Sequence, residues 1–304
     1  MASNACLSFE LFAWRILLEA RGLVRFPPGK GANVLRGALG STLRELVCSP
    51  DCVDATACSA RFTCPYARLF APSALPGAPS GLRDLPRPFV LRAAHLDGRT
   101  FRPGSVFFFD LHLFIPHDPP LDAFLGAFDR LAEVGLGPGR EPARLTRAEP
   151  LPPGRPDGEP HRIDLSPPPD PISRLRVRFL TPTELKAGER VAGTPEFGIL
   201  FARVRDRVSA LRAVYGAGPL PVDFQAIGER ANGVRLVHVD LRHHSVERRS
   251  SRTGQTHPLG GFTGEAEYEG ELTEFAPLLE AARWTGVGRQ TVWGKGAIEV
   301  LDRS

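Results

Sequence analysis

No stretch of this chain is apolar and long enough to cross a lipid bilayer, and the N-terminus lacks a charged region followed by a hydrophobic segment. These absences exclude a membrane-spanning helix and a secretory signal, so we expect a cytoplasmic protein. The P-loop and the dinucleotide-binding glycine fingerprint are also missing. The glycines of this chain therefore need an explanation other than these two nucleotide-binding motifs.

Lysine occurs only at positions 30, 186 and 295, so arginine makes up the rest of the 38 basic residues. Together with 31 glycines and 30 prolines, this bias is typical of a GC-rich genome. The net charge of +4 is for that reason a weak indicator of nucleic-acid binding. A chain of 304 residues with 42% hydrophobic content can bury a sizeable core, and its length favours two domains.

Hydrophobic periodicity predicts the same order of elements twice: strand, helix, two strands, helix, strand. This order is typical of two tandem ferredoxin-like domains of the α+β class. In the first half the periodicity predicts a strand or helix at 7–18, a helix at 32–47, strands at 89–94 and 106–115, a helix at 121–134 and a strand at 143–151. In the second half it predicts a strand at 175–180, a helix at 195–215, a hairpin of 234–245 with 263–272, a helix at 274–283 and a strand at 291–301.

Proline is dense between residues 150 and 171, where neither a helix nor a central strand can continue. We interpret residues 153–171 as a linker. The predicted domains are then residues 1–152 and residues 172–304, each of ordinary domain size.

Four cysteines lie close together in the first domain, at positions that form the spacing C-x3-C-x5-C-x5-C: Cys48, Cys52, Cys58 and Cys64. In a cytoplasmic chain such a group favours a tetrahedral zinc site over disulfides. Four protein ligands leave no position open for water, so the zinc would be structural. The alternative is a set of reduced thiols without metal.

Two clusters of glycine bracket a short helical segment near the C-terminus: Gly260, Gly261, Gly264 and Gly270 before it, and Gly286, Gly288, Gly294 and Gly296 after it. Glycine allows positive φ and close approach of the backbone to a partner. In the second cluster Arg289 and Lys295 lie beside the glycines. Exposed amides next to cations suit phosphate.

The segment WTGVGRQTVWGKG of the second cluster resembles the glycine-rich loop of the precursor-crRNA-processing endoribonucleases, which belong to the RAMP superfamily of CRISPR-associated RNA-binding proteins. The segment FPPGKGANVLRGALGSTLREL, residues 26–46, resembles the first loop and helix of that family, and CPYARLF, residues 64–70, resembles a segment of one branch. The resemblance implies two ferredoxin-like domains and a strand at 7–18. It further implies cleavage of CRISPR repeat RNA without a metal cofactor.

A basic run, RHHSVERRSSR, occupies residues 242–252. It is either the solvated tip of a hairpin or a surface for an RNA backbone, and the nearby glycine clusters favour RNA. Together with the matching regions of the family, the run gives these candidates for RNA binding: Arg36, Arg44, Arg242, Arg248, Arg249, Arg252, Gly286, Gly288, Arg289, Gly294, Lys295 and Gly296.

Metal-free cleavage of RNA needs a base for the 2′-hydroxyl, an acid for the 5′-oxygen and cations near the phosphate. Histidine suits both proton roles near neutral pH. The candidates are His243, His244 and His257, with Lys30 as a cation in the first-helix region. Members of the family commonly place a catalytic histidine in or just after the first helix, whereas this chain has none before residue 95. At most one of the adjacent pair can face bound RNA, because neighbours in a strand point to opposite faces.

These observations favour a repeat-specific endoribonuclease that leaves a 2′,3′-cyclic phosphate. The main alternative is a non-catalytic RAMP subunit that binds crRNA in a CRISPR effector complex, and the missing first-helix histidine favours it. A zinc-stapled DNA-binding protein is less favoured because no recognition-helix motif is present. The expected partners are repeat RNA and, in the second case, other effector subunits.

Overall fold

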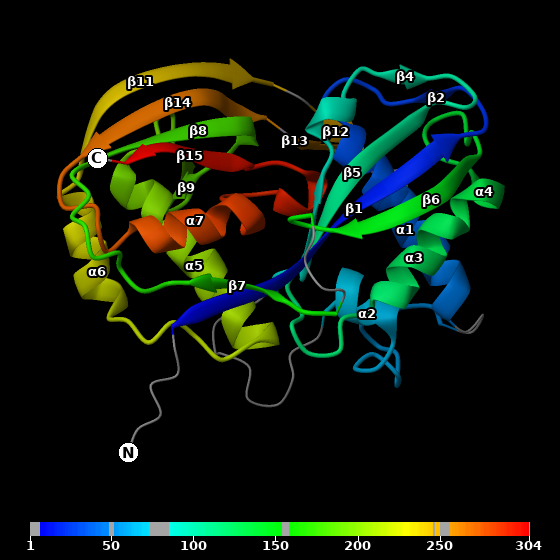
Figure 1. The fold of residues 1–304 in the computed structure, drawn as a ribbon, viewed down its shortest axis with the longest axis horizontal. Coiled ribbons are helices and arrows are strands. Elements are labelled where there is room, and N and C mark those ends of the chain that lie inside the picture. Colours follow the sequence, from blue (N-terminus) through cyan, green and yellow to red (C-terminus); the bar gives the residue numbers. More distant parts are fainter. Residues whose placement is uncertain are drawn as a thin grey trace.

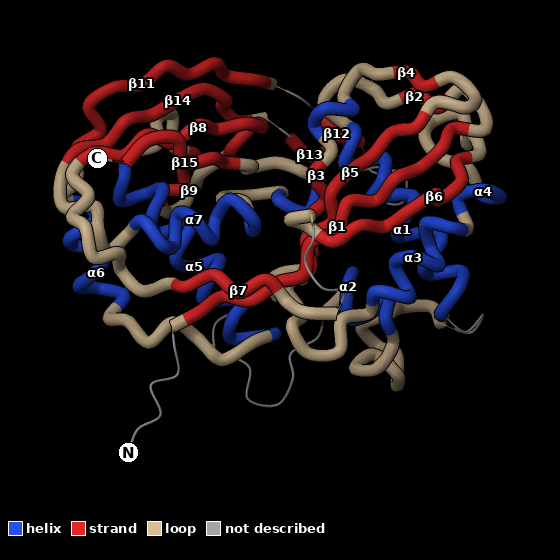
Figure 2. Tube along the Cα trace, in the orientation of Figure 1, coloured by secondary structure: helices blue, strands red, loops and turns tan. Residues whose placement is uncertain are grey.

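The structure is a computed structural model that describes residues 7–48, 52–72, 85–153, 158–245, 247–249, 256–258 and 260–303. Two antiparallel sheets lie side by side, and helices cover the same side of both (Figures 1 and 2). No helix among the described residues is long and apolar enough to span a membrane. The chain has the mixed α+β organisation that the sequence predicts.

The first sheet has the strand order β3-β5-β1-β6, and β7 extends it by pairing with the first residues of β1. Helices α1 and α3 pack on this sheet and on each other, because their apolar residues recur at helical spacing. The elements of this half are β1 (Ser8–Ala20), β2 (Val24–Arg25), α1 (Gly31–Val47), α2 (Pro65–Phe70), β3 (Phe89–Arg92), η1 (Ala94–Leu96), β4 (Thr100–Phe101), β5 (Val106–Leu113), α3 (Leu121–Asp129), α4 (Leu131–Val134), β6 (Ala143–Pro150) and β7 (His161–Asp164).

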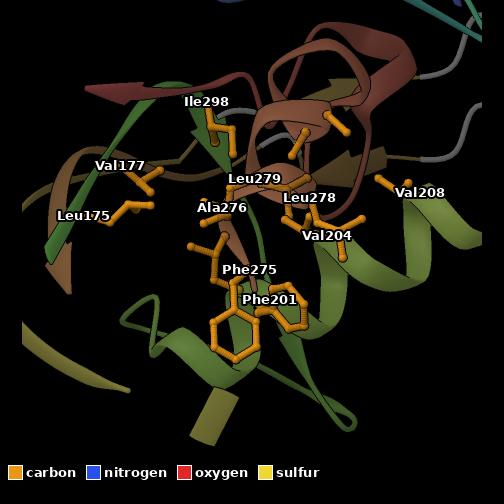
Figure 3. Packing of buried hydrophobic residues seen from close by; sticks show 14 of the residues in the cluster. Leu175, Val177, Phe201, Val204, Val208, Phe275, Ala276, Leu278, Leu279 and Ile298 are labelled. Atoms are coloured by element: carbon orange, nitrogen blue, oxygen red, sulfur yellow. The ribbon is translucent and has the colours of Figure 1, made fainter. Parts of the chain in front are cut away.

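The second sheet has the order β11-β14-β8-β15. If the four strands of this order, and the four of β3-β5-β1-β6, are each numbered 1 to 4 along the chain, both orders read 2-3-1-4. Its apolar face packs on α5 and α7, as the cluster in Figure 3 shows. The elements of this half are β8 (Arg174–Thr183), β9 (Lys186–Ala187), β10 (Arg190–Val191), α5 (Phe197–Tyr215), α6 (Phe224–Asn232), β11 (Arg235–His244), β12 (Glu247–Arg249), β13 (Thr256–Pro258), β14 (Gly261–Glu269), α7 (Ala276–Thr285), η2 (Thr291–Trp293) and β15 (Ile298–Arg303).

The structure differs from the sequence prediction at several places. Residues 153–171, predicted to be a linker, contain the strand β7. The helix predicted at 121–134 is divided at Arg130 into α3 and α4. Helix α6 was not predicted, and neither was the hairpin of β12 with β13. The last strand begins at Ile298 and not at residue 291, because a 3₁₀ turn between two left-handed residues interrupts the chain there.

Strand β1 contributes to both hydrophobic cores. Phe9, Leu11 and Ala13 belong to the core under the second sheet, whereas Ile16 and Leu18 belong to the core under the first. In Figure 1 the first part of β1 and its partner β7 run past α7, which therefore has the second sheet above it and this ribbon below it in that view. The two halves consequently share a strand as well as a boundary.

The solvent face of the second sheet is a ladder of arginine and glutamate side chains on neighbouring strands. Arg174 pairs with Glu267, and Arg178 pairs with Glu265 at 2.8 Å. Further pairs join Arg176 to Glu265, Arg235 to Glu269 and Arg178 to Glu299. Exposed pairs of this kind stabilise a fold only weakly, because solvent screens them. Their larger effect is to make this face nearly neutral.

The C-terminal end of α7 lies at the junction of the two halves and is capped by side chains from β3, β5 and α5. Arg92 of β3 donates from Nη2 to the carbonyls of Arg283 (3.0 Å) and Trp284 (3.2 Å). His112 of β5 donates from Nδ1 to the Trp284 carbonyl at 2.9 Å. These bonds satisfy carbonyls that have no partner within the helix, and cations there complement the negative end of the helix dipole.

Replacing His112 by Asn should weaken the dependence of stability on pH. Burial, and next the positive charge of Arg92, lower the pKa of His112 to about 3, so the folded protein keeps this imidazole neutral. Below about pH 6.5 this histidine is protonated in the unfolded chain and stays neutral in the folded chain. The free energy of unfolding therefore falls by about 1.4 kcal/mol for each unit by which the pH is lowered. Urea unfolding at about pH 7 and about pH 5 should show a loss in the wild type that is about 2 kcal/mol larger than in His112→Asn.

The matched control is His238→Asn, which removes an exposed histidine of β11. This control should keep the pH dependence of the wild type. If His112→Asn and the wild type lost stability in parallel, the buried imidazole would not be the source of the acid sensitivity.

Candidate nucleic-acid interface

The glycine-rich loop, defined here as residues 286–296, joins α7 to β15. Five of its residues have positive φ: Gly286, Gly288, Gln290, Gly294 and Gly296. This backbone is accessible to glycine at little cost, which explains the composition of the segment. The loop lies between the two halves of the chain and contacts a different element on each side.

On one side the loop packs on the start of α1. A Cβ atom added to Gly294 would lie 2.5 Å from the Cβ of Ala32, closer than two carbon atoms can approach. Lys295 donates from Nζ to the carbonyl of Gly29 at 3.0 Å. Lys30 is the N-cap residue of α1, so this candidate cation lies next to the contact.

Arg36 of α1 is held between two aromatic rings. Its guanidinium carbon lies 5.3 Å from the ring centre of Phe70 and 5.6 Å from that of Trp293, which belongs to the glycine-rich loop. Such cation–π contacts stabilise by about 0.5–1 kcal/mol at exposed sites and more when they are desolvated. The candidate RNA-binding residue Arg36 therefore also attaches the loop to the first half.

Lys295 is buried, with 5% of its surface exposed. Burial lowers the pKa of Lys295, and the carboxylate of Asp97 opposes this effect. Asp97 accepts a hydrogen bond from the backbone N–H of Gly31 at 2.6 Å, and burial raises the pKa of its carboxyl group. The structure thus places the candidate Lys295 inside the joint between loop and helix. Asp97 follows a short 3₁₀ turn and carried no local sequence signal for this role.

On the other side the loop packs on the end of β8. The backbone N–H of Arg289 donates to the carbonyl of Glu184 at 3.1 Å, and a Cβ at Gly288 would collide with that carbonyl. Arg289 also pairs through Nη1 with the buried carboxylate of Glu184 at 2.5 Å. Arg289 keeps 48% of its side chain exposed and remains within reach of a ligand.

His243 and His244 end strand β11, at the same end of the second sheet where Glu184 follows β8. His243 pairs across the sheet with Phe262, which in turn pairs with Thr183, the last residue of β8. The side chain of His243 is exposed, and its ring packs edge-on against Phe262. His244 is half-buried, and its Nε2 lies 2.7 Å from the hydroxyl of Thr263 in a hydrogen bond. Only His243 is therefore open to a ligand.

The basic run continues from β11 into the hairpin of β12 and β13. The backbone of His257 pairs with that of Arg248, and Arg249 pairs with Thr256. Arg242 is exposed on β11. Arg252 lies outside the described residues. The backbone thus brings His257 and two of the candidate arginines onto one short hairpin beyond the end of β11.

The four cysteines follow α1 as a loop that Arg44 attaches to the helix. Arg44 donates from Nη2 to the carbonyls of Cys52 (3.1 Å) and Val53 (3.4 Å). Cys48 makes thiol contacts with Cys64 and Cys52, and Cys52 makes one with Cys58. All four are free thiols. Across the described part of the chain, no three His, Cys, Asp or Glu side chains are already arranged to hold a metal ion.

Two family models match the chain. One, described as an N-terminal domain, matches residues 9–163, and the other, described as CRISPR-associated endoribonuclease Cas6, matches residues 177–298. The second match includes the whole glycine-rich loop. Over residues 177–298 the chain is a member of the Cas6 family. Its membership of the crRNA-processing family, predicted from the loop and the first helix, is confirmed, as is the prediction of a CRISPR-specific endoribonuclease.

Solved Cas6 structures have a similar fold. The product complex of Cas6 (TTHB231) is 21% identical with a TM-score of 0.58, and the match covers 95% of this chain and 99% of that chain. Thermus thermophilus Cas6 (TTHB231) is 20% identical with a TM-score of 0.56, covering 96% and 98%. The product complex of Cas6 (TTHA0078) is 20% identical with a TM-score of 0.54, covering 97% and 100%. No curated protein sequence matches the chain.

Replacing Gly294 by Ala should displace the loop from α1. The substitution places a side chain at φ +76° and drives its Cβ into Ala32. Gly104→Ala is the matched control, because Gly104 has φ +85° with nothing within 4 Å of the added Cβ. Both variants carry backbone strain, but Gly294→Ala should lose about 1–3 kcal/mol more in urea unfolding because of the steric clash. Equal losses would show that the close packing of loop and helix does not contribute to stability.

Proposed function

We propose that this Cas6 family member binds CRISPR repeat RNA and cuts precursor crRNA once per repeat, without metal, leaving a 2′,3′-cyclic phosphate. The observation that carries the proposal is the family match over the half that contains the glycine-rich loop. The loop lies between the start of α1, where Lys30 is the N-cap residue, and the end of β8, and His243 lies two strands from β8 at the same end of the second sheet. We also infer that both halves are ferredoxin-like domains, which their common strand order supports, and that the protein is cytoplasmic.

In the proposed reaction His243 removes the proton of the 2′-hydroxyl. Its exposed imidazole is open to a ligand, whereas the Nε2 atom of His244 is engaged by Thr263. Lys30 acts as a cation beside the phosphate, since an ordinary lysine is protonated and a poor base at neutral pH. His257 is the candidate acid for the leaving 5′-oxygen, because its hairpin follows β11, the strand that carries His243.

The proposed partner is repeat RNA. Relatives of the same fold were solved as product complexes. Another structural relative is the partial Cas6-RT-Cas1–Cas2 complex, with a TM-score of 0.56 and 11% identity, whose chain is about twice as long as the matched part. Contact with other CRISPR subunits is the corresponding proposal for this chain.

A non-catalytic role in holding crRNA is the second candidate. It is favoured by the first helix, where α1 carries no histidine at any position. The two candidates make opposite predictions for a cleavage experiment, because both bind repeat RNA and only one cuts it.

Purified protein incubated with end-labelled repeat RNA in EDTA should give a single cut. A substrate with a 2′-deoxy group at the scissile nucleotide should be bound and not cut, since the attacking hydroxyl is missing. His243→Ala should reduce the single-turnover rate by about 10²–10⁴-fold, the usual contribution of a general base. His244→Ala is the matched control and should change the rate much less. Tight binding of repeat RNA with no cut by the wild type would instead assign the non-catalytic role.

We also propose that Cys48, Cys52, Cys58 and Cys64 bind one structural zinc ion. The thiol contacts within the group support this, and ion binding would draw the four sulfurs around one point. Elemental analysis of purified protein should find about one zinc per chain. Cys58→Ser should lower both the zinc content and the melting temperature while cleavage in EDTA persists. Metal-free protein with four thiols that react with a thiol reagent in the folded state would contradict the zinc site.

A further inference from the structure

A cavity of about 290 Å³ lies where the glycine-rich loop, α5 and the segment before β3 meet. Three arginines from these three parts line it: Arg87, Arg207 and Arg289. We call this cavity the arginine pocket. No aspartate or glutamate lines it, and Glu184, which pairs with Arg289, offsets only one of the three charges. The pocket is therefore strongly positive.

Arg207 has an incomplete set of partners. Its Nε donates to the carbonyl of Thr285 at 2.9 Å, which fixes the guanidinium against the end of α7. Its Nη2 is buried and has no hydrogen-bond partner among the described residues. Part of the Arg207 side chain reaches solvent, but this nitrogen does not. A buried guanidinium nitrogen without an acceptor is costly, so an acceptor is expected beside it.

A second cation near Arg207 adds to the positive charge that lacks a compensating anion. Arg92 lies close enough for its charge to lower the pKa of Arg207, after burial, to about 9, and Nη1 of Arg92 is likewise buried without a partner. Both groups stay protonated at neutral pH. The carbonyls at the end of α7 supply partial negative charge. The carboxylate of Asp110 opposes the lowering of the pKa of Arg92, but Asp110 is itself paired with Arg15 at 2.8 Å.

We propose that the arginine pocket binds a phosphate group of the RNA backbone. A phosphate carries full negative charge and several acceptor oxygens, so one group can accept from arginines in different directions. The three arginines are graded in depth: Arg289 is exposed, Arg87 is half-buried and Arg207 presents a buried nitrogen. The pocket is thus open at the loop and most strongly positive inside.

The choice of RNA as the source of the phosphate rests on the proposed function. The loop that forms one wall of the pocket is the loop that also contacts the start of α1 and the residue after β8. Trp293 lies in the same wall and supplies an aromatic surface, which suits a nucleotide better than an inorganic ion. A phosphate held here would fix the register of the RNA along the loop.

The test is a scan of the uncut 2′-deoxy repeat RNA in which one backbone phosphate at a time is replaced by a neutral methylphosphonate. With the wild type, one position should lose about tenfold or more in affinity by filter binding. With Arg207→Gln the same replacement should cost nothing further, and the slope of log affinity against log salt should be shallower by about 0.7. Arg205→Gln is the matched control, because Arg205 is on the same helix and bonds to Asp206 and the Phe224 carbonyl. This control should keep the full effect at that position.

Arg207→Gln also removes a cap from α7, so melting curves accompany the scan, and Arg87→Gln serves as a second variant. The one hydrogen bond described for Arg87 goes to the carbonyl of Phe70, away from α7. If replacing that same phosphate costs no further affinity in Arg207→Gln or in Arg87→Gln, the proposal is supported. A scan in which every position behaves alike in wild type and variants overturns it.

A parallel arm distinguishes a free phosphate from RNA. Melting temperatures are measured with inorganic phosphate and with adenosine monophosphate at constant ionic strength. Stabilisation of the wild type and not of Arg207→Gln, without a special position in the RNA scan, would assign the pocket to a free phosphate and overturn the RNA proposal. Failure of the proposed function has a different signature, since the wild type would then either not bind repeat RNA or bind it without cutting it.

Discussion

The contact on which the rest of this structure depends is the capping of the C-terminal end of α7. Three carbonyls at that end receive donors from Arg92 and His112 in the first half and from Arg207 in α5. The glycine-rich loop begins at the next residue, Gly286, so the position of the helix end fixes the start of the loop. A buried cation bonded to helix carbonyls is costly to separate from them, because removing either partner leaves the other desolvated and unpaired. The two halves are joined by polar groups that must stay together.

The distribution of charge follows from this joint. Arginines on the open face of the second sheet are paired with glutamates, so that face attracts an RNA backbone weakly. Arginines without acidic partners gather instead around the loop, in Arg87 and Arg207. The net charge of +4 is a weak indicator of RNA binding. The positions of paired and unpaired arginines are more informative about where an anion can bind. Two arginines without a carboxylate partner, Arg87 and Arg207, thus line the pocket at the junction of the two halves.

Periodicity predicted most strands and helices of both sheets, because the elements are amphipathic and their apolar faces fill two separate cores. It missed β7 since a proline-rich stretch gives no strand signal, and that strand forms only by pairing with β1. It placed the last strand too early because residues 291–293 are apolar yet held in a 3₁₀ turn by contact with α1. The roles of Asp97, Glu184 and Arg207 could not be predicted, since each depends on a partner far away in the sequence.

The start of α1, the helix without a histidine, is held by the contact around Lys295. Asp97 and Lys295 tie the start of α1 to the loop through Gly31 and Gly29; Lys295 is buried and Asp97 is half-buried. In the second half an exposed histidine, His243, lies on β11, which is separated from β8 by strand β14. The loop itself contacts both halves, because Lys295 bonds to Gly29 before α1 and Arg289 bonds to Glu184 after β8.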